Sequence, residues 1–226
     1  MSRVNWRNIK KTLAIRLAAA LQRAAGAAAW RYPPQFANTP RNLTIQYPRQ
    51  IHGAEHITVG DDVFIGSNAL LNAIRQYPGG IMGSDRYPTP PVHYQPRIEI
   101  GNRVSSTGGL QVSAVEHVCI EDDVMFATNV NITDALHGFE NADIPYKYQP
   151  LFRSAPIRIG KGSWIGQNVV ILPGVSIGEQ CIIGANSTVT KSIPARSIAF
   201  GNPARVHKQW NLTSQQWERV GQATEE

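Results

Sequence analysis

Aliphatic residues recur at every sixth position in the later part of the chain. From Ile159 to Val189, each sixth residue is a β-branched aliphatic residue. A second series of the same period runs from Ser163 to Ile193, and all of its members are small or aliphatic. A fixed period that holds over several units is an internal repeat, and it outranks local predictions of helix or strand. Six residues are too few for a βαβ unit but suffice for one short strand and one corner.

The residues three positions after each aliphatic residue predict where the chain turns. Gly and Asn enter the left-handed backbone region at the least cost. We therefore expect each hexad to be a flat strand followed by a left-handed corner, with its two inward positions, four residues apart, on one face of the strand. Three hexads would close a triangular coil, and coils would stack at about 4.8 Å per layer. The expected corner residues are Gly162, Asn168, Gly174, Gln180 and Asn186.

The same period begins near Ile51 and is interrupted twice, which predicts loop insertions at about residues 72–97 and 134–156. We expect a β-helix over residues 43–202, preceded by a helical extension over residues 1–42. Apolar residues at spacings of three and four predict a helix over residues 4–29. Residues 203–226 are expected to form a loop and a short helix, because Thr213 and Gln216 fit a capping box.

Charge is concentrated at one end of the chain. The net charge is +6, and residues 1–31 carry seven Lys or Arg and no acid. The rest is near neutrality, so the sequence gives no reason to expect a nucleic-acid-binding surface. Two interpretations of the first helix stay open: it packs on the β-helix or a neighbouring subunit, or it rests on an anionic membrane as a basic interfacial helix.

Composition also bears on the compartment. No clean apolar run of about 18 residues is present, so a membrane span is not expected. The two cysteines, Cys119 and Cys181, form no Cys-x-x-Cys or Cys/His cluster, which predicts neither a disulfide framework nor a zinc site. We expect a cytoplasmic protein, which on the membrane interpretation of the helix would lie at the inner face of the membrane.

The hexads, together with the segment Gly201-Asn202-Pro203-Ala204-Arg205-Val206, resemble a known family over about residues 51–208. The chain is similar to the hexapeptide-repeat acyltransferases, in the branch of maltose, galactoside, colanic-acid and nodulation-type O-acetyltransferases. The resemblance implies a mainly β fold, a left-handed parallel β-helix. It also implies acetyl-CoA as co-substrate without a metal, and a homotrimer with sites between subunits.

The resemblance singles out His137 as the catalytic residue. In the family, a histidine lies in a loop that leaves a coil just before a Trp-Ile-Gly hexad, and His137 precedes Trp164-Ile165-Gly166 in this way. An imidazole titrates near neutral pH and suits a general base. Asp134, Glu140 or a backbone carbonyl could orient the imidazole. Where many members carry an asparagine, this chain has Thr107, so the oxyanion would rest on backbone N–H groups.

The resemblance also implies that coenzyme A lies along the outside of the β-helix. Small residues there would let the pantetheine arm approach the backbone, and basic residues would suit the nucleotide phosphates. The small residues can equally be explained as corner residues, and the basic residues as solvated surface charges. These explanations are compatible with coenzyme A binding. The matching positions are Trp164, Gly166, Gln167, Ala185, Thr190, Lys191, Arg205 and Lys208.

The sequence thus predicts an acetyl-CoA-dependent O-acetyltransferase that acts on a sugar hydroxyl of a bacterial surface polysaccharide or its precursor. Transfer would be direct, because neither cysteine is placed to be a nucleophile beside His137. Alternatives within the enzymes are a streptogramin- or chloramphenicol-type antibiotic acetyltransferase and an amino-sugar N-acyltransferase. The non-enzymatic alternative is a β-helical assembly or membrane-docking module.

Overall fold

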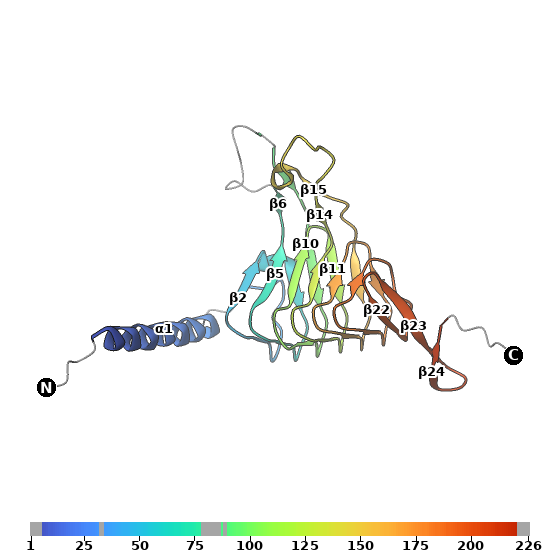
Figure 1. Ribbon diagram of the computed structural model, residues 1–226, viewed down its shortest axis with the longest axis horizontal. Coiled ribbons are helices and arrows are strands. Elements are labelled where there is room, and N and C mark those ends of the chain that lie inside the picture. The colour runs from blue at the N-terminus through green and yellow to red at the C-terminus, as the bar shows by residue number, and fades with distance from the viewer. Residues whose placement is uncertain (1–5, 32–33, 78–86, 88–89, 221–226) are drawn as a thin grey trace. The chain divides into compact units, whose positions relative to one another are not determined.

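The computed structural model describes residues 6–31, 34–77, 87 and 90–220, and it divides into two units. The first unit, Met1–Pro34, contains helix α1 (Trp6–Arg31), which confirms the predicted N-terminal helix (Figure 1). In the described part of the chain, no helix combines the length and hydropathy that crossing a bilayer requires. The second unit, Gln35–Glu226, contains all the strands described below.

The second unit is a stack of coils in which the chain passes in turn through three sheets, named A, B and C here. Sheet A contains β1 (Thr44–Ile45), β4 (Phe64–Ile65), β9 (Ser105–Ser106), β12 (Met125–Phe126), β17 (Trp164–Ile165), β20 (Ile182–Ile183), β22 (Ser197–Gly201), β23 (Ala204–Asn211) and β24 (Gln216–Arg219). Sheet B contains β2 (Arg49–His52), β5 (Ala69–Ala73), β10 (Gln111–Ala114), β13 (Asn131–Thr133), β18 (Val170–Ile171) and β21 (Thr188–Val189). Sheet C contains β3 (Ile57–Val59), β8 (Arg97–Ile100), β11 (His117–Ile120), β16 (Ile157–Ile159) and β19 (Ser176–Ile177).

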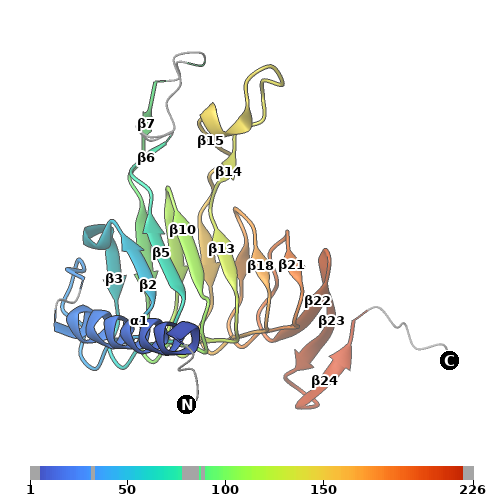
Figure 2. The same cartoon turned by 60° about the vertical axis from the view of Figure 1, so that its left-hand side comes forward.

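Strands of successive coils pair in parallel, so each sheet is a ladder of equivalent positions (Figures 1 and 2). Ile165, for example, pairs with Phe126 in one neighbouring coil and with Ile183 in the other. The six-residue period predicts stacked coils of short strands, and the resemblance implies a mainly β fold with parallel strands. A mainly β fold with parallel sheets is confirmed.

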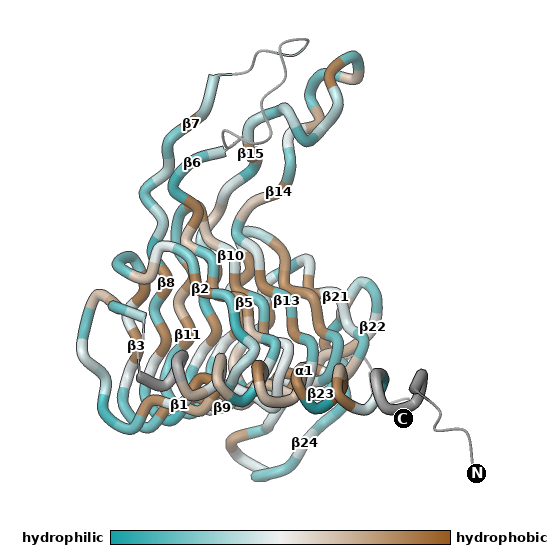
Figure 3. The backbone as a smooth tube through the Cα atoms, turned by 90° about the vertical axis from the view of Figure 1, so that its left-hand side faces the viewer, coloured by the Kyte–Doolittle hydropathy of each residue, from teal (hydrophilic) through white to brown (hydrophobic). Residues whose placement is uncertain are grey.

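The predicted inward residues form the core, where apolar bands follow the strands (Figure 3). The grouping of these residues on strands differs from the prediction. Ser163, directly before β17, and Ile165, at its end, are both buried and two residues apart, whereas the pair four apart, Ile159 and Ser163, lies on either side of the corner at Gly162. Side chains on a strand alternate between faces, so the shorter spacing is the one that a single strand satisfies. The first inward series is at most 1% exposed: Ile159, Ile165, Ile171, Ile177, Ile183 and Val189.

The predicted corners have left-handed backbone conformations. Positive φ occurs at Gly162, Asn168, Gly174, Gln180 and Asn186, with values from 55° to 78°. Arg103 (φ 55°) also occupies such a corner, which its residue type does not indicate. Glycine is required after an inward aliphatic residue for a different reason, the close approach of the next coil. A Cβ on Gly66 would lie 1.9 Å from the carbonyl oxygen of Thr107 in that coil.

Both predicted interruptions leave the stack at the corner between sheets B and C. The first connects β5 to β8 and contains the hairpin of β6 (Gln76–Tyr77) and β7 (Val92–His93). The second connects β13 to β16 and contains the hairpin of β14 (Leu136–His137) and β15 (Leu151–Phe152). Short 3-10 turns, η1 (Ala54–His56) and η3 (Tyr146–Tyr148), lie in the first coil and the second insertion. The two hairpins project in the same direction from the stack (Figure 2).

The predicted C-terminal helix is wrong over the described residues. β22, β23 and β24 pair antiparallel instead, and Trp210 and Trp217 face each other as a cross-strand pair with ring centroids 5.5 Å apart. The side chain of Asn211 accepts hydrogen bonds from the backbone of Thr213 and Ser214, which closes a turn where a helix cap was expected. The edge strand of sheet A offers backbone N–H and C=O groups that a further strand can hydrogen-bond, whereas a helix bonds its own backbone internally. Residues 221–226 lie outside the described part.

Candidate functional site

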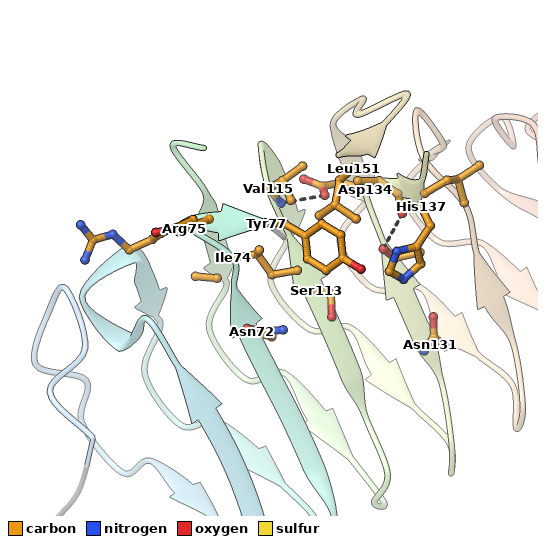
Figure 4. Close-up of a pocket in the computed structure, with 15 residues that line it drawn as sticks. Asn72, Ile74, Arg75, Tyr77, Ser113, Val115, Asn131, Asp134, His137 and Leu151 are labelled. Atoms are coloured by element: carbon orange, nitrogen blue, oxygen red, sulfur yellow. Dashed lines mark hydrogen bonds between the residues drawn. The ribbon is translucent and has the colours of Figure 1, made fainter. Parts of the chain in front are cut away.

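A cavity of about 740 Å³ lies on the outer face of sheet B, at the base of the two insertions (Figure 4). Its floor is polar and comes from neighbouring coils, because Ser113 pairs in register with Asn72 on one side and Thr133 on the other. Asn131, also in the floor, donates a hydrogen bond from Nδ2 to Oε1 of Gln111 at 3.1 Å. Its walls include Ile74, Tyr77, Leu136, His137 and Leu151. Uncharged hydroxyl and amide groups therefore converge below an imidazole.

His137 is exposed at the end of β14, and its ring and that of Tyr77 lie toward each other above the floor (Figure 4). The ring centroids are 5.2 Å apart, with an angle of 64° between the ring planes. The backbone of His137 pairs with Leu151. Gly138 makes this pairing close, because a Cβ there would lie 2.5 Å from the carbonyl oxygen of Pro150. The backbone that carries the imidazole is therefore well fixed.

Asp134 lines the cavity, but its carboxylate serves the backbone. It is fully buried, and its two oxygens accept hydrogen bonds from the N–H groups of Val115 (2.9 Å), Glu116 (2.8 Å) and His117 (2.8 Å). Burial raises the pKa of Asp134 above its usual range, while the backbone donors act in the opposite direction. Asp134 thus ties the start of the second insertion to the corner of the preceding coil.

The other expected partners of His137 are not among the described residues that line the cavity. Glu140 is exposed on the second insertion. Thr107 is exposed at a corner between sheets A and B, where its carbonyl oxygen lies against Gly66. Of the three residues expected beside His137, Asp134 is the one found among the described residues that line the cavity.

The residues expected to hold coenzyme A lie outside this cavity. Trp164 is 47% exposed on sheet A, and Gly166 and Gln167 form the corner after it. The backbone of Ala185 lies beside Gly166, since a Cβ on Gly166 would lie 2.7 Å from the Ala185 nitrogen. The described lining of the cavity includes none of the expected coenzyme A residues. The remaining ones follow β21 or lie on β23: Thr190, Lys191, Arg205 and Lys208.

Comparisons with known proteins agree with the repeat. Residues 156–191 match the family model "Bacterial transferase hexapeptide (six repeats)", and residues 56–74 match "Hexapeptide repeat of succinyl-transferase". WbbJ from Escherichia coli, named provisionally as a lipopolysaccharide biosynthesis O-acetyl transferase, is 31% identical over 183 residues, which cover 78% of this chain and 83% of WbbJ. The chain belongs to the hexapeptide-repeat acetyltransferases. It is an acyltransferase by this membership.

Two further proteins are similar to this acetyltransferase, one in sequence and one in structure. The galactoside O-acetyltransferase of Escherichia coli is 36% identical over 132 residues, which cover 58% of this chain and 64% of that enzyme. AntD, an N-acyltransferase from Bacillus cereus solved with dTDP and coenzyme A, superposes with a TM-score of 0.59 at 20% identity. That comparison covers 79% of this chain and 87% of AntD, and it supports the fold.

Two residues that organise the site of this acetyltransferase were not singled out from the sequence. Gln149 is 6% exposed, and its side-chain amide bonds to the backbone of Asn141 and Ile144, which closes the second insertion on itself. Tyr77 contacts His137 from the other insertion. Gln149 lies in a polar segment, which suggests an exposed loop residue. Tyr77 precedes Pro-Gly-Gly in a loop whose aromatic residues could stack on a sugar or form a subunit contact, but nothing in the sequence connects it with His137.

Proposed function

We propose that this acetyltransferase transfers the acetyl group of acetyl-CoA to a sugar hydroxyl, with His137 as general base. The supporting observation is the imidazole of His137 above a floor of hydroxyl and amide side chains, in a cavity of about 740 Å³. That volume lies in the range of small-molecule sites. The names of the similar WbbJ and galactoside enzymes favour a surface polysaccharide or its precursor as acceptor.

Direct transfer fits the chemistry of the residues. His137 takes the proton of the acceptor hydroxyl while the oxygen attacks the thioester carbonyl, and the collapsing tetrahedral intermediate expels the thiolate, which receives that proton. Backbone N–H groups stabilise the oxyanion. Burial raises the pKa of both Cys119 and Cys181, which disfavours a thiolate nucleophile. In this proposal Asp134 positions the insertion, and Glu140 and Thr107 remain candidates on the acceptor side.

The acyl donor is proposed to run along the corner of Trp164, Gly166, Gln167 and Ala185. Thr190 and Lys191 would follow, with Arg205 and Lys208 near the nucleotide phosphates. None of these residues lines the cavity of the same subunit, so a second subunit is needed to bring the donor to His137. We therefore propose that the protein is a left-handed β-helix that assembles as a homotrimer. One subunit would then present its donor corner to the His137 cavity of its neighbour.

The acceptor can be identified by the bond that forms. The enzyme is incubated with radiolabelled acetyl-CoA and a panel of p-nitrophenyl glycosides, matched amino-sugars and chloramphenicol. We expect label on a glycoside, released by alkaline hydroxylamine, which cleaves oxygen esters and spares amides. Label that hydroxylamine does not release would replace this proposal with an N-acyltransferase. Label on chloramphenicol alone would favour an antibiotic acetyltransferase, and absence of both transfer and acetyl-CoA binding would favour a non-enzymatic module.

A peripheral membrane contact through α1, at the cytoplasmic side, is proposed on a separate observation. Leu13, Leu17 and Leu21 repeat at a spacing of four residues, on one face of the helix, and are 60–63% exposed. The helix carries basic residues and no acid along its length. An apolar face flanked by cations suits an anionic bilayer surface.

We expect the triple variant Leu13→Ser, Leu17→Ser, Leu21→Ser to lose at least about tenfold in affinity for phosphatidylglycerol vesicles, since each buried leucine contributes roughly 1.5–3 kcal/mol. Cosedimentation measures the binding. The matched control is Ile15→Ser, because Ile15 is equally exposed (60%) but lies two residues from Leu13 and Leu17, on another face. Equal binding by the triple variant and the control, or no binding by the unmodified protein, would instead favour packing of α1 on protein.

A further inference from the structure

We infer that Tyr77 holds the imidazole of His137 in its working orientation, as a positioning residue supplied by the other insertion. This inference rests on the proposed role of His137 as the base. The two residues lie 60 positions apart in sequence, on β6 and β14, and their rings meet edge-on above the floor of the cavity (Figure 4).

The imidazole has no acid to orient it among the residues that the structure describes. Both oxygens of Asp134, the nearest acid in sequence, are engaged by the backbone of residues 115–117. His137 is exposed, so its ring would otherwise be free to rotate about its side-chain bonds. The contact with Tyr77, at 5.2 Å and 64°, is an edge-to-face arrangement of the kind that aromatic pairs prefer. It restricts the ring where a carboxylate is missing.

Tyr77 is itself held at both ends. Its backbone pairs with Val92 in the first hairpin, and its hydroxyl donates a hydrogen bond to the carbonyl oxygen of Lys147 at 3.0 Å in the second insertion. Burial raises the pKa of Tyr77, so the hydroxyl remains a donor at neutral pH. A ring anchored in this way is a fixed wall against which the imidazole packs.

The simpler interpretation is that Tyr77 only joins the two insertions, as a second tyrosine does. The hydroxyl of Tyr94 accepts a hydrogen bond from the N–H of Leu151 at 3.1 Å, close to the strand pair that carries His137. Tyr94 is not among the described residues that line the cavity. Tyr94 therefore provides a matched control: it anchors the same hairpin, and among the described residues the aromatic ring in contact with His137 is that of Tyr77.

The kinetic test uses the full-length protein with acetyl-CoA and p-nitrophenyl β-galactoside. We expect Tyr77→Leu to lower kcat about tenfold with little change in the KM for acetyl-CoA, as loss of an aromatic contact of about 1.5 kcal/mol implies. Tyr77→Phe keeps the ring and should keep kcat within about threefold of the unmodified enzyme. This small decrease is the effect expected from the loss of one hydrogen bond. Tyr94→Phe should lie in the same range.

A second measurement reports on the ring contact without any activity. In protein labelled at histidine, the His137 ring signal is assigned with His137→Gln and carries the ring-current shift of Tyr77. Tyr77→Leu should move that signal, whereas Tyr77→Phe and Tyr94→Phe should leave it nearly in place. An unmoved signal in Tyr77→Leu overturns the inference whatever the reaction is.

The kinetic outcomes separate the inference from the function. Tyr77→Leu with unchanged kcat, beside an inactive His137→Gln, overturns the positioning role and leaves the proposed function intact. Tyr94→Phe as damaging as Tyr77→Leu shows that anchoring of the insertion is the cause, and also overturns it. An active His137→Gln removes the proposed function, and the positioning role falls with it even where the NMR contact is present.

Discussion

Replacement of His137 by Gln is expected to lower kcat by roughly 100- to 10,000-fold, the usual contribution of a general base. Gln keeps much of the volume and hydrogen-bonding capacity of the side chain but cannot take a proton from the acceptor hydroxyl. Because the expected donor residues lie outside the cavity of His137, the KM for acetyl-CoA should change little. Release of free thiol from acetyl-CoA in the presence of a glycoside acceptor measures both constants.

His93→Gln is the control for this variant. His93 is exposed on β7, in the first insertion, and is not among the described residues that line the cavity. Its replacement should leave kcat within about twofold, as surface substitutions usually do. If His137→Gln kept activity within about threefold, the base would have to be another group, and transfer by simple positioning of acceptor and donor would become the better mechanism.

The β-helical core could be predicted because its constraint is local and repeated. Every coil must bury the same positions, so Ile165 and Val169 are specified by the same rule as Ile57 and Val63, and all four are buried. The rule is weaker at corners. A left-handed corner tolerates residues other than Gly and Asn when neighbouring groups compensate, as at Arg103, where the guanidinium pairs with Asp123.

The insertions and the end of the chain could not be predicted in the same way, because their contacts are long-range and do not repeat. Tyr77 bonds to a carbonyl 70 residues away, and Tyr94 to a backbone group 57 residues away. The strand pair β23 and β24 depends on the free edge of β22, which a local helix-capping pattern does not include. His137 was selected as the candidate base through the position of its loop before a repeat, which is again a feature of the period.

Asp134 shows how a carboxylate expected beside the imidazole can bond to the backbone instead. It lies three residues before His137, and a carboxylate there suggests a partner for the imidazole. Ile100 pairs with Ile120, 20 residues later, whereas Ile159 pairs with Ile177, 18 residues later, so the turn between β10 and β11 has two extra residues. This turn brings the backbone N–H groups of residues 115–117 near Asp134. Buried N–H groups require acceptors, and the carboxylate is used for them.

Asp134→Ala is therefore expected to act mainly on stability, with a loss of about 3–5 kcal/mol. It removes the acceptor of three buried or partly buried N–H groups, each worth about 1–3 kcal/mol when left unsatisfied. Removing the buried carboxylate charge recovers part of this free energy. The gain is smaller than the cost of leaving three N–H donors without an acceptor. The melting temperature, measured at fixed protein concentration, should fall by roughly 6–20 °C.

Asp134→Asn should give an intermediate loss of about 1–3 kcal/mol, because the amide oxygen can replace the oxygen that serves Glu116 and His117, while the amide NH₂ then opposes the N–H of Val115. Asp143→Asn, in an exposed carboxylate of the same insertion, is the matched control and should change stability by no more than about 0.5 kcal/mol. A carboxylate that oriented the imidazole would give the opposite pattern. Both Asp134 variants would then melt like the unmodified protein and lose kcat, and that result would return Asp134 to the catalytic group.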